Sequence, residues 1–168
     1  AIGDDSLLVC TTGVNNVAVG GDALKAVTIG TGNVGIGKSA GDALTTGVNN
    51  IAIGLDALGA ATITTDCVAI GKDALKACVD GVSNVAIGTG ALDAVTTGAD
   101  NVAIGTNAGG ALTIGTDNIC IGDQAGLALT TGINNVAIGG DALDAATIST
   151  GCVAIGKNAL LACTTGIK

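Results

Sequence analysis

Apolar and polar positions recur along this chain with a 17-residue period. A glycine stands at every seventeenth position from Gly3 to Gly156, without an insertion. We number each repeat so that this glycine is position 5; residues 1–15 then form a partial first repeat, and complete repeats begin at residues 16, 33, 50, 67, 84, 101, 118, 135 and 152. The approximate consensus is N-V-A-I-G-x-D-A-L-x-A-x-T-T-G-V-N. A fixed period of this length is typical of proteins in which each repeat packs only on its neighbours.

Each repeat begins with a short β pattern. Positions 2 and 4 are always Val or Ile, and position 3 is nearly always Ala, which is the period-2 alternation of a strand. Gly at position 5 and polar residues at positions 6 and 7 predict a turn, and positions 9 to 14 predict a second extended segment. A repeat this short leaves no room for a helix. The sequence therefore predicts an all-β fold, a parallel β-solenoid of ten 17-residue coils about 48 Å long.

The distribution of charge suggests which positions face inward. All twenty charged residues occupy positions 6, 7, 10, 14 or 17. We therefore expect the branched residues of positions 2 and 4 to form the core, among them Ile53, Ile70, Val85, Ile87, Val102 and Ile104. Position 1 is Asn in seven of nine complete repeats, which predicts a ladder of side-chain amides.

A longer period is superimposed on the short one. Cys67 and Cys78 recur five repeats later as Cys152 and Cys163. The chain is thus predicted to be one solenoid domain, residues 1–168, made of two five-coil halves, 1–83 and 84–168. Positions 14 and 16 alternate in kind: each repeat carries one apolar residue at one of them, which we interpret as packing at a corner of the coil.

Composition restricts the possible functions. The chain has no aromatic residue, no Met, Pro or His, and a net charge of −8. Acidic charge argues against a nucleic-acid partner, and no apolar run is long enough to insert into a membrane. Without His and without inward carboxylates, no catalytic, metal-binding or cofactor-binding group of residues is evident, so we expect no enzyme activity.

One stretch resembles a nucleotide-binding loop. Residues 30–39 read GTGNVGIGKS and fit both the dinucleotide pattern G-x-G-x-x-G and the P-loop pattern G-x-x-x-x-G-K-[ST]. Gly37, however, is the position-5 glycine of its repeat, and no helical pattern follows Ser39. A P-loop needs a helix whose N-terminus faces the phosphate. We interpret the match as a by-product of the repeat and expect no nucleotide to bind.

The consensus resembles the N-T-A-I-G-x-x-A-L repeats of phage tail fibres and large bacterial surface proteins, and more loosely the A-I-G repeats of trimeric autotransporter adhesin heads. Residues 84–100, NVAIGTGALDAVTTGAD, carry the resemblance well, and it extends over the whole chain. It implies a parallel β-roll that serves as a spacer, stalk or binding surface. It also implies a location outside the cell, on a cell or virion surface.

The leading hypothesis is a structural, non-catalytic solenoid that associates with itself into a fibre or filament. The first and last repeats look like the middle ones, so residues 152–168 are expected to stack on residues 1–15 of another copy. Cys10 and Cys163 would then meet across the joint. The competing arrangement is a lateral trimer with position 12 as its seam. Two pairs, Cys67 with Cys78 and Cys152 with Cys163, are candidate disulfides within a coil; buried free thiols are the alternative, and the state of Cys10 and Cys120 is open.

Two further functions are open. An ice-binding solenoid is suggested by a threonine ladder at position 13, formed by Thr11, Thr28, Thr45, Thr62, Thr96, Thr113, Thr130, Thr147 and Thr164. A receptor- or glycan-binding module would instead use Asp and Asn at positions 6, 7 and 17. Calcium near Asp4, Asp5 and Asp22 is conceivable, but the usual calcium-binding repeat is missing.

Overall fold

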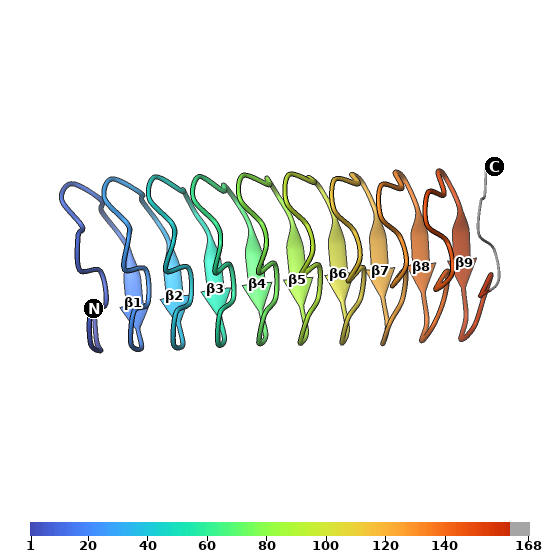
Figure 1. Cartoon of the computed structure of the whole chain (residues 1–168), viewed down its shortest axis with the longest axis horizontal. Coiled ribbons are helices and arrows are strands. Elements are labelled where there is room, and N and C mark those ends of the chain that lie inside the picture. The colour runs from blue at the N-terminus through green and yellow to red at the C-terminus, as the bar shows by residue number, and fades with distance from the viewer. Residues whose placement is uncertain (162–168) are drawn as a thin grey trace.

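The chain forms a single rod of stacked coils (Figure 1). The computed structural model describes residues 1–161. One parallel sheet contains nine three-residue strands in sequence order. They are β1 (Val17–Val19), β2 (Val34–Ile36), β3 (Ile51–Ile53), β4 (Val68–Ile70), β5 (Val85–Ile87), β6 (Val102–Ile104), β7 (Ile119–Ile121), β8 (Val136–Ile138) and β9 (Val153–Ile155).

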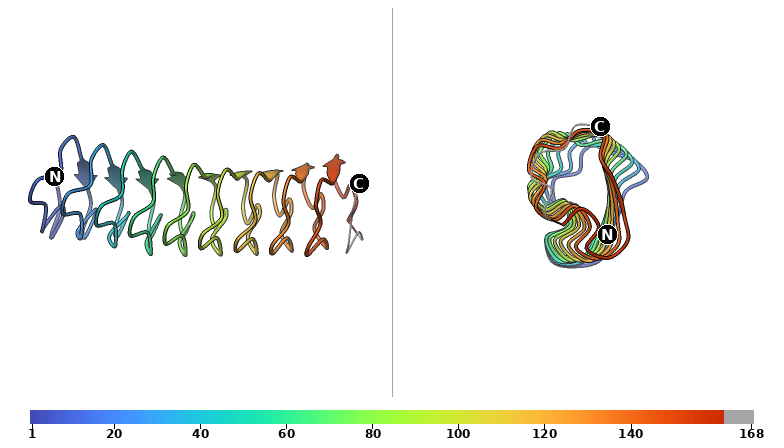
Figure 2. Two further views of the ribbon diagram at one scale, coloured as in Figure 1. Left: turned by 90° about the horizontal axis from the view of Figure 1, so that it is seen from above. Right: turned by 90° about the vertical axis from the view of Figure 1, so that its right-hand side faces the viewer.

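The register confirms the solenoid predicted from the 17-residue period. Every strand pairs with the strand one repeat later, so Val85 of β5 pairs with Val102 of β6. In the partial first repeat Ile2 makes a parallel bridge to Val19. Seen along the rod, each coil is a closed loop with one straight side, which is the sheet (Figure 2). Parallel stacking follows because identical positions of successive repeats prefer the same local conformation.

The core differs from the prediction made for positions 2 and 4. In all nine strands the middle residue, position 3, is buried, and Ala86 is fully covered. Positions 2 and 4 are exposed or half-buried, so Ile53, Ile70, Val85 and Val102 do not belong to the core. Ile87 and Ile104 are 36% and 38% exposed.

Limited space explains the reversal. The interior of each coil is lined by positions 1, 3, 8, 9 and 12, which are mostly Asn, Ala, Ala, Leu and a small or branched residue. Alternation in a strand places positions 2 and 4 on the opposite face from position 3. A coil this short encloses too little volume for two branched side chains per strand in addition to the leucine, so the small residue faces inward.

One leucine fills each coil, from either of two places. Most coils have it at position 9, as Leu92, which is 1% exposed. In three coils position 9 is glycine and the leucine stands at position 12, as with Gly109 and Leu112. A Cβ on Gly109 would lie 2.8 Å from Leu92 Cδ2, so the leucine of one coil packs over the glycine of the next. A leucine therefore contributes to the core of each coil from one of these two positions.

The position-5 glycines form the edge of the sheet at which every strand turns. Gly71 has φ of +135°, and a Cβ there would lie 2.5 Å from the carbonyl oxygen of Gly88. Any other residue would clash with the backbone of the adjacent coil. The invariance of this glycine is therefore a requirement of close stacking.

Three other expectations about local structure are wrong. Positions 9 to 14 do not form a second strand; they contain turns whose amides bond within the coil and to the next coil. The corner isoleucines of position 14 are not packed, since Ile63 and Ile114 are 53% and 55% exposed. Position 12 cannot be an intermolecular seam, because Val27, Leu44 and the other residues there from 27 to 146 are fully buried.

Candidate interaction surface

The most distinctive surface of the molecule is the outer face of the sheet. Positions 2 and 4 of β1 to β9 place eighteen Val and Ile side chains on it, and each of them is exposed or half-buried. We call these eighteen residues the aliphatic face. The strands that carry them form the straight side of the coil in Figure 2. A continuous apolar strip of this size is uncommon on a monomeric protein and usually marks an interaction site.

Nine strands spaced about 4.8 Å apart make the aliphatic face about 43 Å long, and the three residues of each strand make it about 10 Å wide. No charged side chain belongs to it, because positions 2 to 4 are uncharged throughout. Position 6 carries charges along one side, with Lys38 and Lys72, and position 17 carries them along the other, with Asp66, Asp100 and Asp117. An apolar centre with a polar border is the usual composition of a protein–protein interface.

The asparagine ladder of position 1 holds the sheet to the opposite wall of the coil, as the sequence predicted. Asn101 Nδ2 donates to the carbonyl of Gly115 at 2.8 Å and to Asn84 Oδ1 at 3.0 Å. Its own Oδ1 accepts from the backbone and side-chain nitrogens of Asn118, at 3.1 and 3.0 Å. The side chain is fully buried. The ladder thus gives hydrogen-bond partners to polar groups that would otherwise be buried without them.

The threonines of position 13 also form a ladder, but their hydroxyl hydrogens are engaged. Thr28 Oγ1 donates to the carbonyl of Thr45 at 3.2 Å, and Thr113 Oγ1 donates to that of Thr130 at 3.0 Å. The same bond recurs at Thr11, Thr45, Thr62, Thr96 and Thr130. Val79 interrupts the series. Thr147 is exposed, and Thr164 lies outside the described residues. Each of these hydroxyls donates a hydrogen bond to the next coil. The lone pairs of its oxygen are left to accept hydrogen bonds from water.

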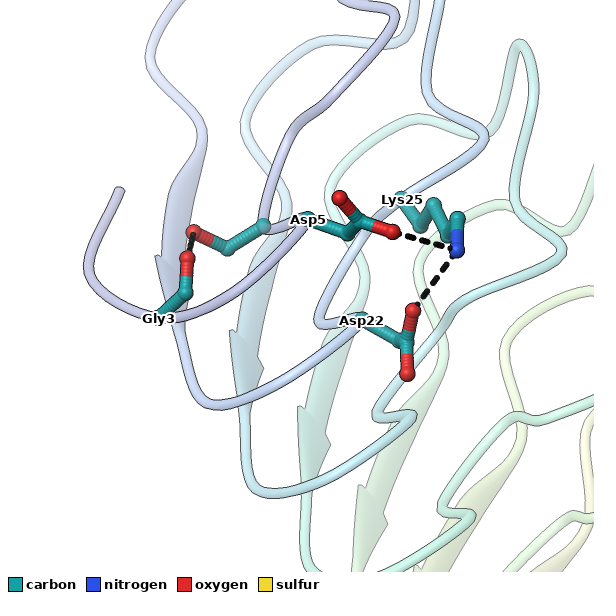
Figure 3. A network of polar contacts seen from close by, with 5 residues as sticks. Gly3, Asp5, Asp22 and Lys25 are labelled. Atoms are coloured by element: carbon teal, nitrogen blue, oxygen red, sulfur yellow. Dashed lines mark hydrogen bonds and ion pairs between the residues drawn. The ribbon is translucent and has the colours of Figure 1, made fainter.

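A second set of charged side chains, at positions 7 and 10, lies on the turns that follow position 6. Lys25 bonds Asp5 and Asp22 at 2.8 Å each and so links the first two coils (Figure 3). The hydrogen bonds to Asp22 and then Asp5 raise the pKa of Lys25 above its usual value. Asp4 is exposed beside this group. Because Lys25 offsets one of the two negative charges of Asp5 and Asp22, this group attracts a metal cation less strongly than the sequence suggested.

Two aspartates of position 10 have altered acidity. Partial burial raises the pKa of Asp42, and the negative charge of Asp56 raises it further. Partial burial likewise raises the pKa of Asp93. On the neighbouring turn the hydrogen bonds from Lys72 and Lys76 lower the pKa of Asp73. These shifts arise from partial burial for Asp42 and Asp93 and from the neighbouring lysines for Asp73.

The cysteines are free thiols throughout the described part of the chain. Cys67 and Cys78 are both fully buried and lie in one coil, so the predicted pair is brought together without being bonded. Cys120 is buried at position 3 of β7, where burial raises its pKa to about 12. Cys10 is half-buried and Cys152 is buried. The predicted pairs of Cys152 and of Cys10 with Cys163 cannot be placed, since Cys163 lies outside residues 1–161.

The nucleotide-binding motif does not form a phosphate loop. Strand β2 lies inside it, at Val34–Ile36, and turns rather than a helix follow Lys38. In residues 1–161 no pocket is found, and no three possible ligands gather as a metal site. Nor does that part of the chain contain a helix long and apolar enough to cross a bilayer.

Comparison of the chain with protein-family models, curated proteins and solved structures found no match. The functional proposal therefore rests on the fold and on the aliphatic face.

Sequence reasoning missed the aliphatic face because it assigned the face to the interior. A signal was present in the sequence. Every coil already has a leucine at position 9 or position 12, as with Leu92 or Leu112. Two further branched residues per coil exceed what so short a loop can enclose, whereas Ala at position 3 fits.

Proposed function

We propose that this protein is a structural, non-catalytic solenoid that associates side by side with copies of itself through the aliphatic face. The observation that carries the proposal is the continuous exposure of Val and Ile on the outer side of β1 to β9. Removing these side chains from water favours association by about 25 cal/mol for each Å² buried.

A second copy is the partner that fits this face. Two copies that cover a strip of about 43 by 10 Å bury roughly 900 Å² in total as a flat area, which is close to the value of about 1,000 Å² expected of a specific interface. Both surfaces also carry side chains at the same spacing along the rod, one pair of branched residues for each strand. Ridges of one copy can therefore pack between ridges of the other over the whole length, which a surface without this repeat cannot do.

Whether the assembly closes as a dimer or trimer, or grows into a fibre, depends on the angle between neighbouring sheets. A location on a cell or virion surface belongs to the same proposal and is supported by the resemblance of the repeats. The head-to-tail contact at residues 152–168 stays a separate prediction, because residues 162–168 lie outside the described part of the chain.

Sedimentation equilibrium of a matched pair of variants tests the proposal. Ile87→Lys with Ile104→Lys places two charges in the centre of the aliphatic face, and we expect the protein to become monomeric. Ile63→Lys with Ile114→Lys makes the same change at two exposed corner residues, and association should persist. Circular dichroism checks that both variants keep the β spectrum. A wild-type chain that is monomeric at 100 µM or above, or a corner variant that dissociates equally, contradicts the proposal.

A further inference from the structure

The coil of residues 67–83 departs from its neighbours at its centre. Cys67 replaces the ladder asparagine at position 1, and Cys78 stands at position 12. Cys67 Sγ donates to the carbonyl oxygen of Gly81 at 3.4 Å, in the place where Asn84 Nδ2 bonds Gly98 at 2.7 Å one coil later. Cys78 Sγ lies 2.7 Å from the point that a Cβ on Gly81 would occupy. Both sulfurs therefore lie against the same glycine.

The side chain of Cys67 interrupts the asparagine ladder. In an unbroken part of the ladder Asn84 Oδ1 accepts from the backbone N and Nδ2 of Asn101. At the break, the backbone N–H of Cys67 still donates to Asn50 Oδ1 at 3.1 Å, and its Sγ donates to the carbonyl oxygen of Gly81. The thiol thus keeps the bond to the opposite glycine but offers no amide to the next coil.

These contacts make the two thiols unequal. The hydrogen bond from Cys78, followed by those from Asn84, lowers the pKa of Cys67. The same bond with Cys67, together with burial, raises the pKa of Cys78. Because a thiolate is the attacking form in disulfide exchange, the direction of these shifts favours Cys67 as the attacking thiol.

We propose that Cys67 and Cys78 are an oxidisable dithiol that closes to a disulfide within the coil, by exchange with a small disulfide such as oxidised glutathione. The Cys67 thiolate attacks one sulfur of the small disulfide, and a mixed disulfide forms as one small thiolate leaves and takes up a proton. Cys78, once deprotonated, attacks the Cys67 sulfur and expels the second small thiol. Two electrons pass from the two cysteine sulfurs to the small disulfide, and the two protons end on the released thiols.

Burial makes this exchange depend on opening of the coil. Both cysteines are 0% exposed, so the small disulfide reaches Cys67 only when the coil opens. Exchange is then slow in the folded rod and faster in mild denaturant. Once the bond has formed, the closed coil shields it from reductants. Oxidation therefore links two sides of the coil of residues 67–83 by a disulfide that is reduced only slowly.

Peptide mass spectrometry of the full-length protein tests the inference. After equilibration with oxidised glutathione in low urea and alkylation, we expect one linked peptide pair, Cys67 with Cys78. The melting temperature of the oxidised protein should rise by roughly 5–10 °C, since the bond closes a loop within one coil. The same treatment of a Cys120→Ala variant should give the same link. Alkylation of both Cys67 and Cys78 after this treatment overturns the inference, as does a link of either to Cys120.

A pair of single variants tests which thiol attacks. Cys78→Ala should fold, because Ala61 fills position 12 in the preceding coil. In this variant glutathione should accumulate on Cys67, whereas in Cys67→Ala we expect at least a tenfold lower rate of addition to Cys78. Equal rates at the two sulfurs contradict the assigned order. Neither measurement depends on self-association through the aliphatic face.

Discussion

At the scale of single residues, buried amides and buried alanines decide the conformation of the coil. Asn101 makes four hydrogen bonds in a fully buried place, and Ala86 fills the space behind the sheet without crowding it. An amide ladder suits this interior because each Asn has both donors and an acceptor, so every copy can satisfy the next. Cys67 shows that the ladder tolerates a thiol at position 1, where its Sγ donates to the carbonyl of Gly81 in place of an amide.

Replacement of Asn101 by Ala should reduce the free energy of unfolding by about 3 kcal/mol or more, because it leaves the carbonyl of Gly115 and the amides of Asn118 buried without partners. Urea denaturation followed by circular dichroism measures the loss. Thr106→Ala, at an exposed place in the same coil, serves as the control and should change stability by less than about 0.5 kcal/mol. Similar losses in the two variants would show that the ladder is not a principal source of stability.

At the scale of the coil, the leucine is the element that sets the core volume. Coil 84–100 combines Leu92 with Val95, and coil 101–117 combines Gly109 with Leu112. Leu92 also has φ of +50°, an unfavourable region for a leucine, which the packing of the coil enforces. Position 9 therefore accepts glycine easily, provided that position 12 supplies the missing volume.

A double-mutant cycle tests this compensation. Leu92→Gly alone should lower the free energy of unfolding by about 3 kcal/mol, because it opens a cavity. Val95→Leu alone should cost about 1–3 kcal/mol, because it overfills the coil. The double variant reproduces the arrangement of the next coil, so its loss should be clearly smaller than the sum of the two single losses, as measured by denaturant unfolding. Additive losses in the double variant would mean that the two positions do not share one space.

At the scale of the whole molecule, the rod separates two kinds of surface. The aliphatic face runs along β1 to β9, and the charged turns of positions 7 and 10 lie apart from it, with ion pairs such as Lys76 to Asp73 at 2.8 Å. The rod has an apolar surface that repeats along its length, and no pocket is found in its described part. Such a shape is suited to assembly along a line.

Self-association should therefore not be weakened by salt. Because no charged residue belongs to the aliphatic face and each copy carries a net charge of −8, raising sodium chloride from 0.05 to 0.5 M should leave the dissociation constant unchanged or lower it. Sodium sulfate at equal ionic strength should tighten association, since it strengthens the burial of apolar surface. Sedimentation equilibrium in the two salts measures both effects. A tenfold weakening in sodium chloride would assign the contact to the charged turns instead.

Much of the fold follows from the period alone. An uninterrupted 17-residue repeat requires position n to stack on position n, and the pairing of Val85 with Val102 is the direct result. The glycine of position 5 and the asparagine of position 1 were also informative, because close stacking and a buried amide ladder each restrict the residue at one place. The candidate cysteine pair was recognised from its shared coil, and the structure places both thiols beside Gly81.

The side of the strand that faces inward was decided only by the tertiary structure. Alternation at period 2 separates Ala86 from Val85 and Ile87, but it is equally consistent with either set inside. The choice depends on how much space the closed coil leaves beside Leu92, and that volume is a property of the loop in three dimensions. The sequence by itself determined the solenoid, its register and its ladders; the enclosed volume determined that its branched residues became a surface.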